Sequence, residues 1–375
     1  MRGLRFYAAL ITAVIVPGLA LSQAAPQRQT PLPVSVAGRV VELPEGGYRF
    51  GWPAIYFEAR FKGPNVSLAV ETHSDRFAVL IDGTQRALVT RPGMARLWFD
   101  HLGPGEHAIR LEKLTENNWG SARFLGFFPG AGTTPLAPPK RARQIEFIGD
   151  SYTVGYGDAS PSRVCKRDEV RTLTDTQLAF GPVAAGRLGA DYRVIAHSGY
   201  GVVRNYGGST PGESMISIYP RQIPSEPTPV DDRASGWRPQ LIVIGLGNND
   251  FSMPVKPGEP WADAEALRID YRQSYVRFVR QLLQRDPQAH VVLMAAANYA
   301  PDVEAVASTL NRDDPQRVRV LHYGGLELTG CDWHPSAGDH QALAASLLTT
   351  IEGIDGLWGP WKAASSGPTH RASAD

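Results

Sequence analysis

Cysteine is scarce in this chain of 375 residues, which has only two, Cys165 and Cys331. Two thiols can form at most one disulfide, and no cysteine–histidine cluster has the spacing of a zinc site. An excess of charge is missing as well, because 38 basic side chains face 37 acidic ones. We therefore expect neither nucleic acid nor an anionic membrane as a partner. The stretch Gly245–Asp250 is glycine-rich but lacks the lysine of a phosphate-binding loop, so we expect no cofactor and no metal.

The N-terminus carries an apolar run, Phe6–Leu21, that follows two arginines. Small residues in Ser22-Gln23-Ala24 then suit a cleavage site. A membrane anchor is the alternative, but the run is short for a span and Pro17-Gly18 interrupts it. We predict a cleaved signal peptide over residues 1–24, and hence a secreted or periplasmic protein without a membrane partner.

Glycine and proline are frequent, at 38 and 30 residues, which favours a loop-rich chain with many strands. After a mobile leader at 25–33, residues 34–129 show short alternating strand patterns. Turn signals such as Asp82-Gly83 separate these patterns. This spacing predicts an all-β sandwich.

A proline-rich linker is expected at 130–142, and beyond it strand patterns alternate with helical ones. Such alternation predicts a parallel sheet covered by helices on both faces, an α/β/α domain over residues 143–358. We expect a disordered tail at 359–375. The strands are expected at Ile145–Ile148, Asp191–Ala196, Leu241–Gly245, Val291–Ala295 and Val318–His322.

Four polar segments follow the ends of predicted strands, where parallel sheets place their sites. Gly149-Asp150-Ser151 puts a serine at a strand exit, the position of an activated nucleophile. The late segment Asp332-Trp333-His334 supplies a histidine that can act as general base and then as acid. We predict Ser151 as nucleophile and His334 as base in an acyl-transfer reaction.

The other two segments supply hydrogen-bond donors for the oxyanion of such a reaction. They are the turn around Gly199, and Asn249 in Gly-x-Asn-Asp. We predict that the backbone N–H groups of Ser151 and Gly199 and the side chain of Asn249 receive the oxyanion.

These four segments resemble the conserved blocks of the SGNH, or GDSL, hydrolase superfamily. The longer forms Gly149–Gly157 and Arg204-Asn205-Tyr206-Gly207, behind a β-sandwich, are most similar to carbohydrate esterase family 2. The resemblance implies a jelly roll followed by an α/β/α domain with a flavodoxin-like parallel sheet. It also implies a carbohydrate O-acetylesterase acting on polysaccharide of the xylan or glucomannan type.

The chain departs from the superfamily pattern beside its histidine. The usual spacing is Asp-x-x-His, but here Asp332 lies two residues before His334 and Cys331 lies three before it. We assign Asp332 as the third catalytic residue. The alternative is a Ser–His dyad in which a backbone carbonyl orients the ring, as the resemblance implies for some family members.

The two cysteines flank the same predicted site, so we expect a disulfide between Cys165 and Cys331; two separate buried thiols are the alternative. Aromatic rings stack on sugars, and we predict that Trp333, Tyr206 and Tyr152 contact the substrate. Filling of the loop core is the alternative role for these rings.

The sequence leaves two rival functions. The first keeps the fold and changes the acyl group, giving a GDSL-type lipase, thioesterase or aryl esterase. The second is a non-catalytic carbohydrate-binding protein. We expect a monomer whose partner is an acetylated polysaccharide or oligosaccharide.

Overall fold

The computed structural model describes residues 30–117, 120–229 and 236–359. The predicted signal peptide lies outside the described residues, as do most of the leader and nearly all of the predicted tail. None of the helices in the described part of the chain has the length and apolar character needed to cross a bilayer.

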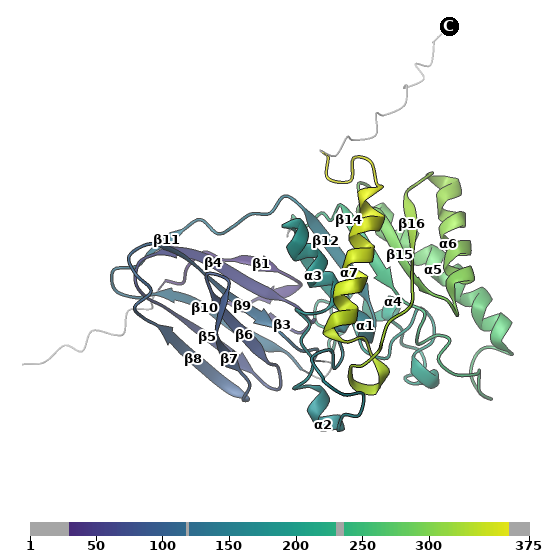
Figure 1. Cartoon of the computed structure of the whole chain (residues 1–375), viewed down its shortest axis with the longest axis horizontal. Coiled ribbons are helices and arrows are strands. Elements are labelled where there is room, and N and C mark those ends of the chain that lie inside the picture. Colours follow the sequence, from purple (N-terminus) through teal and green to yellow (C-terminus); the bar gives the residue numbers. More distant parts are fainter. Residues whose placement is uncertain (1–29, 118–119, 230–235, 360–375) are drawn as a thin grey trace, which may run out of the picture. The chain divides into compact units, whose positions relative to one another are not determined.

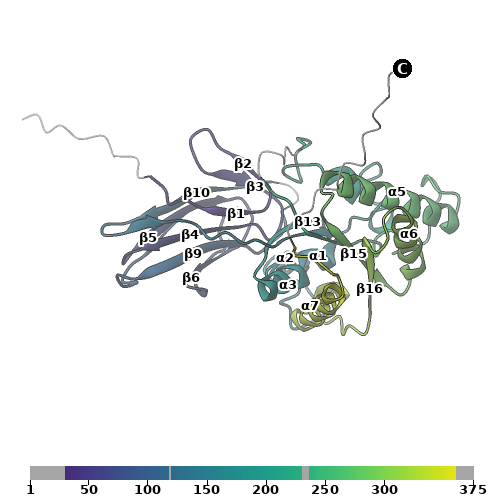
Figure 2. The same ribbon diagram turned by 90° about the horizontal axis from the view of Figure 1, so that it is seen from above.

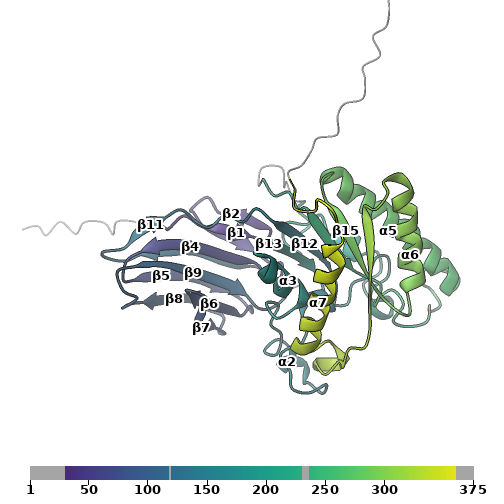
Figure 3. The same ribbon diagram turned by 45° about the horizontal axis from the view of Figure 1, so that its top comes forward.

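The first domain consists of two antiparallel sheets (Figure 1). One has the strand order β1-β4-β9-β6-β7, with β11 also paired to β4, and the other has the order β2-β3-β10-β5-β8. The strands can be followed in Figure 3. Their bounds are β1 Ser35–Ala37, β2 Val40–Glu42, β3 Tyr48–Phe50, β4 Tyr56–Lys62, β5 Val66–Thr72, β6 Phe77–Ile81, β7 Thr84–Val89, β8 Gly93–Phe99, β9 Glu106–Lys113, β10 Ala122–Pro129 and β11 Thr134–Leu136.

Alternating burial explains why these segments pair as a sandwich. Along β9, Ile109 and Leu111 are fully buried while their neighbours are partly exposed. Phenylalanines from the two sheets meet between the layers, where the rings of Phe57 and Phe124 stack with centroids 4.3 Å apart. The predicted all-β sandwich is confirmed. The segment expected to be a plain linker contains β11, because Thr134–Leu136 adds a short strand to the edge of β4.

The second domain contains a parallel sheet of order β13-β12-β14-β15-β16, which is the flavodoxin-like strand order. Helices α3 and α7 cover one face and α5 and α6 the other (Figure 2), so the predicted α/β/α class is confirmed. The strands are β12 Gln144–Gly149, β13 Asp191–Ala196, β14 Leu241–Gly245, β15 His290–Ala296 and β16 Val318–Tyr323. The helices are α1 Ser151–Val154, α2 Arg167–Val170, α3 Phe180–Leu188, α4 Met215–Ile218, α5 Ala264–Arg285, α6 Ala300–Asp313 and α7 Ala337–Glu352, with single 3₁₀ turns η1 Tyr206–Gly208 and η2 Cys331–Trp333.

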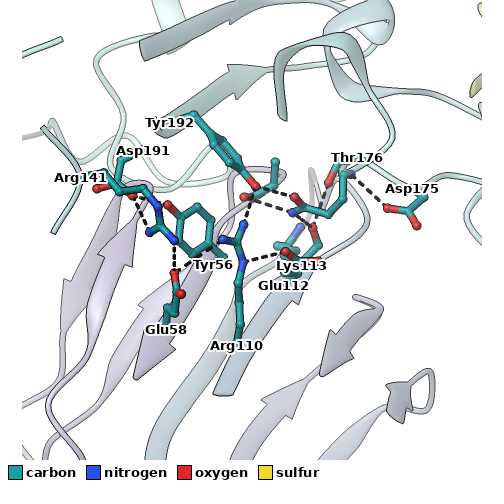
Figure 4. A network of polar contacts seen from close by, with 12 residues as sticks. Tyr56, Glu58, Arg110, Glu112, Lys113, Arg141, Asp175, Thr176, Asp191 and Tyr192 are labelled. Carbon is teal, nitrogen blue, oxygen red and sulfur yellow. Dashed lines mark hydrogen bonds and ion pairs between the residues drawn. The ribbon is translucent and has the colours of Figure 1, made fainter. Parts of the chain in front are cut away.

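A network of polar contacts joins β4 and β9 of the sandwich to β13 of the parallel sheet (Figure 4). The hydroxyl of Tyr56 donates to Asp191, and Arg141 donates to both Asp191, at 3.1 Å, and Glu58, at 2.8 Å. Arg110 lies over the ring of Tyr56, 3.6 Å from its centroid. Burial raises the pKa of Tyr56 well above its usual range, so its hydroxyl remains a donor.

A second connection is fully buried. Arg39, which follows β1 and is 1% exposed, forms an ion pair with Glu146 in the middle of β12 at 3.5 Å, and also donates to the carbonyl of Tyr219. Burial alone would raise the pKa of Glu146. The positive charges of Arg285 and Arg39 outweigh that effect and lower it, so the carboxylate stays ionised.

We predict that Arg39→Ala will lower the free energy of unfolding by about 1–3 kcal/mol, because it removes the donor to the buried Tyr219 carbonyl and one of the two arginines paired with Glu146, which keeps Arg285. The matched control is Arg60→Ala, which breaks the exposed pair with Glu106 and should cost less than about 1 kcal/mol. Urea denaturation of both variants measures the difference. Equal losses would show that the buried pair contributes no more than a surface one.

Candidate active site

Strand β12 positions Ser151 at the carboxyl edge of the sheet. The strand ends at Gly149, where a side chain would collide with Thr153 Oγ1 at 1.9 Å and Gly245 O at 3.0 Å. Asp150 follows as the N-cap of α1, and its carboxylate accepts the N–H of Tyr152 at 3.0 Å. This tight turn leaves the Ser151 hydroxyl within hydrogen-bonding distance of His334.

His334 lies directly against this serine. Its Nε2 is 2.9 Å from Ser151 Oγ, and its Nδ1 is 3.0 Å from the carbonyl oxygen of Cys331. A carbonyl only accepts hydrogen bonds, so Nδ1 carries the proton and Nε2 is left as the acceptor for the serine hydroxyl. Burial lowers the pKa of His334 below its ordinary value of 6.5, which favours the neutral ring. The structure therefore brings together the two residues predicted as nucleophile and base.

The carboxylate of Asp332 is not hydrogen-bonded to the ring of His334. It accepts the hydroxyl of Tyr156 at 3.1 Å, and among the described residues no ion pair or hydrogen bond joins it to the imidazole, whose two nitrogens face Cys331 O and Ser151 Oγ. Its negative charge nevertheless raises the pKa of His334, opposing part of the effect of burial. The partner that the sequence favoured for Nδ1 is thus replaced by the Cys331 carbonyl.

The segment before His334 has an unfavourable backbone conformation that its neighbours hold in place. Asp332 and Trp333 both have positive φ, at 52° and 63°, a region that residues other than glycine rarely adopt. The N–H of Asp332 donates to the carbonyl of Arg163 at 2.8 Å, and that of Cys331 to Gly157 at 3.2 Å.

The predicted disulfide between Cys165 and Cys331 is confirmed, and it is an additional restraint on this segment. Arg163 adds another, because its guanidinium donates to the carbonyls of Glu327 and Leu328 and lies 4.2 Å from the ring centroid of Trp333. The loop around Cys165 therefore fixes the carbonyl that orients the histidine.

The turn after β13 carries Gly199 and begins beside the serine segment, where the N–H of His197 donates to Gly149 O at 3.1 Å. Gly199 has φ of 84°, and its carbonyl accepts the N–H of Tyr206 at 2.8 Å. The buried carboxylate of Asp250 holds the rest of this turn by accepting the N–H groups of Val202, Val203 and Arg204. Asp250, which ends the Gly-x-Asn-Asp motif, thus fixes this turn.

Asn249 bonds to Asp150, the residue that precedes Ser151. Its Nδ2 donates to Tyr200 O at 2.9 Å and to Asp150 Oδ2 at 3.2 Å. Burial raises the pKa of Asp150 to about 7 and that of Asp250 to about 6. Both carboxyls bond to loop backbone and amide groups rather than to His334.

The predicted substrate-contacting aromatics differ in exposure. Trp333 is 64% exposed and Tyr206 is 59% exposed, so both present a ring face to solvent near the site. Tyr152 is partly buried, and its ring contacts those of His334 and Tyr323. The geometry of Tyr152 fits the core-filling alternative as well as a role in binding.

Sequence reasoning missed three residues that lie around the base. Tyr156 packs on His334 with ring centroids 4.5 Å apart, and Arg163 holds the loop as described above. Glu116, from the loop that follows β9 of the sandwich, accepts the N–H of Ser198 at 3.1 Å, next to Gly199. Tyr156 lies within the serine motif itself, whereas nothing in the pattern around Glu116 indicates a place near the site.

Comparison with known proteins agrees with this geometry. Residues 36–139 match the model of the carbohydrate esterase 2 N-terminal domain, and residues 147–339 match the GDSL-like lipase/acylhydrolase family. An acetylxylan esterase / glucomannan deacetylase of Cellvibrio japonicus is 41% identical over 92% of this chain and 98% of its own length.

Solved structures give the same assignment. A carbohydrate esterase whose active site displays divergent catalytic and non-catalytic binding functions is 41% identical. That match covers 88% of this chain and 100% of its own, with a TM-score of 0.82. A family two carbohydrate esterase from Clostridium thermocellum in complex with cellohexaose is 27% identical over 87% of this chain and 100% of its own, with a TM-score of 0.75. The chain therefore belongs to carbohydrate esterase family 2, within the GDSL-like lipase/acylhydrolase family, and is a hydrolase of carboxylic ester bonds.

Proposed function

We propose that this enzyme removes O-acetyl groups from polysaccharide of the xylan or glucomannan type, with Ser151 as nucleophile. The observation that carries the proposal is the 2.9 Å contact between Ser151 Oγ and the unprotonated Nε2 of His334. The choice of substrate is supported by the identity of 41% to a relative named for both deacetylation reactions.

In the first half-reaction, the Ser151 hydroxyl gives its proton to His334 Nε2 as Oγ bonds to the acetyl carbonyl carbon. The carbonyl π electrons move to oxygen, and the oxyanion accepts hydrogen bonds from the backbone N–H groups of Ser151 and Gly199. The imidazolium then protonates the sugar oxygen as the ester bond breaks, leaving acetyl-Ser151. In the second half-reaction water attacks the acetyl carbon and Nε2 again takes the proton. The bond from that carbon to Ser151 Oγ then breaks as the imidazolium returns the proton to Oγ, and acetic acid leaves and ionises to acetate.

Asn249 is the proposed third donor to the oxyanion. Its two amide hydrogens point at Tyr200 O and Asp150 Oδ2 in this structure, and the second bond is the longer at 3.2 Å. A full negative charge is a better acceptor than a carboxyl that burial favours in its neutral form, so the oxyanion would compete for that hydrogen.

We further propose that the catalytic pair is a dyad oriented by the Cys331 carbonyl, with Asp332 acting only through its charge. Export is part of the proposal, because a disulfide persists in an oxidising compartment and the N-terminal pattern is that of a signal peptide. Trp333 and Tyr206, with exposed rings beside the site, would stack on sugar units of the polymer.

Replacement of Ser151 by Ala is expected to reduce hydrolysis of p-nitrophenyl acetate by at least about a thousandfold, because the nucleophile is lost. Acetate release from acetylated xylan and glucomannan, measured on the same samples, should fall in parallel. Circular dichroism and the thermal midpoint confirm that the fold is retained. Hydrolysis at the wild-type rate by folded Ser151→Ala would refute the assignment.

The pH dependence of kcat/KM tests the role of Asp332. Activity needs neutral His334, so kcat/KM should rise with pH through a midpoint below the ordinary histidine value of 6.5. Asp332→Asn removes a charge that raises this pKa, so the midpoint should move further to acid. At pH 8 the rate should fall less than about tenfold, whereas loss of a true triad aspartate costs about ten-thousandfold. A loss of that larger size would establish the triad.

Glu116 is expected to act as a positioning residue, because it holds Ser198 N–H beside the proposed donor Gly199. We predict that Glu116→Ala lowers kcat on p-nitrophenyl acetate about tenfold with little change in KM. Glu116→Gln keeps an acceptor oxygen and should recover most of the rate. Both variants remove a charge that raises the pKa of His334, so both should shift the pH midpoint to acid. An unchanged kcat in Glu116→Ala would show that the turn needs no support from the sandwich.

A further inference from the structure

A cavity of about 490 Å³ is lined by the chain that follows the Gly199 turn, and neither Ser151 nor His334 lines it. Its walls come from residues 202–217, from 258–261 and from one face of α5. The volume is within the range of pockets that hold small ligands. The mechanism described above makes no use of this space.

One wall is an aromatic ring held by a chain of hydrogen bonds. Trp261 Nε1 donates to Asp270 at 3.0 Å, Ser274 Oγ donates to the other oxygen of Asp270 at 3.0 Å, and Arg277 donates to Ser274 at 2.8 Å. Asp270, Ser274 and Arg277 are spaced so that they share one face of the helix. The chain therefore fixes the indole at the cavity before any ligand arrives.

The strongest charges around the cavity already have partners of opposite charge. Arg204 is 2% exposed and donates to both oxygens of Glu259, at 2.8 and 3.0 Å. Glu213 accepts from Arg221 and from the hydroxyl of Tyr200. The remaining two charges at the walls, Asp270 and Arg277, have opposite signs and are joined through the hydroxyl of Ser274. Each charge at the cavity thus has a counter-charge, directly or through one hydroxyl, which favours a neutral ligand.

Hydrogen-bonding capacity nevertheless remains. The side chains of Ser209 and Gln281 line the cavity and are exposed, and neither makes a hydrogen bond within the described residues. Ile216 and Phe278 supply an apolar part of the cavity wall. A fixed indole, an apolar surface and free neutral donors and acceptors together match a sugar ring, which has apolar faces and a rim of hydroxyls.

The cavity is also connected to the catalytic turn through a short piece of chain. Gly199 O accepts the N–H of Tyr206 at 2.8 Å, and Gly208, two residues further, lines the cavity. With about 3.8 Å between consecutive Cα atoms, Gly208 is within roughly 12 Å of Gly199. The exposed ring of Tyr206 lies at this junction.

We propose that the Trp261 cavity is a neutral-saccharide subsite that binds unacetylated sugar units of the same polymer whose acetyl group lies at Ser151. This subsite rests on the proposed function, since it deepens the account of the polysaccharide substrate. It gives the enzyme affinity for the chain that the acetyl group alone does not provide.

The test compares Trp261→Ala and the cavity-filling Ile216→Trp with the matched control Trp98→Ala, which removes a 66% exposed indole from β8 of the sandwich. KM on acetylated glucomannan should rise about three- to tenfold in both cavity variants. The kcat/KM on p-nitrophenyl acetate, which is too small to reach the cavity from Ser151, should change less than about twofold. The control should match wild type on both substrates, and thermal midpoints identify any variant that has not folded.

Calorimetric titration with cellohexaose separates failure of the subsite from failure of the proposed function. If wild type releases no acetate from any polysaccharide, the proposed function fails. Weaker cellohexaose binding by Trp261→Ala and Ile216→Trp would still support the subsite. Unchanged polymer KM and unchanged cellohexaose affinity in both folded cavity variants would overturn it. A higher KM for p-nitrophenyl octanoate without any change in cellohexaose affinity would also overturn it, because it would assign the cavity to an acyl chain.

Discussion

The hydrogen bond from His334 Nδ1 to the Cys331 carbonyl is the contact on which the rest of the site depends. It fixes which nitrogen carries the proton, and so leaves Nε2 free to accept from Ser151. A carbonyl can do this only if its peptide is held, and here the following two residues have positive φ. Such a backbone persists only when its surroundings determine it. The disulfide to Cys165, the Arg163 contacts and the bond to Gly157 provide that restraint.

A loop of the β-sandwich contacts the same site. Glu116 belongs to its loop after β9, yet it bonds to the turn that carries Gly199. That contact is useful only if the two domains keep a fixed relation, and the buried pair of Arg39 with Glu146 supplies a strong coupling between them. A sandwich that merely tethered the polymer would need neither the buried arginine nor the carboxylate beside the catalytic turn. We therefore regard the sandwich as part of the catalytic scaffold.

Sequence reasoning succeeded where side-chain identity carries the signal. The strand patterns gave both fold classes, and the motifs brought Ser151, His334 and Asn249 to one edge of the sheet. It favoured Asp332 over the carbonyl of Cys331 because every residue has a carbonyl, so no residue type marks the one that is used. Glu116 was missed because its contact depends on how two domains pack, which local periodicity does not encode. The short strand β11 was hidden for a related reason, since its pairing with β4 is a tertiary contact.

Activity and stability depend on pH in opposite directions because of two buried carboxyls, Asp150 and Asp250. Burial raises the folded-state pKa of Asp150 from 3.8 to about 7 and that of Asp250 to about 6, so the folded protein holds these protons more tightly than the unfolded chain does. Stability from this source is therefore present at acid pH and falls as pH rises from about 4 towards 7. Across part of the same interval His334 loses its proton and becomes able to act as a base. Burial lowers the pKa of His334 and raises those of Asp150 and Asp250. The enzyme is therefore most active in the pH range in which these two carboxyls stabilise the fold least.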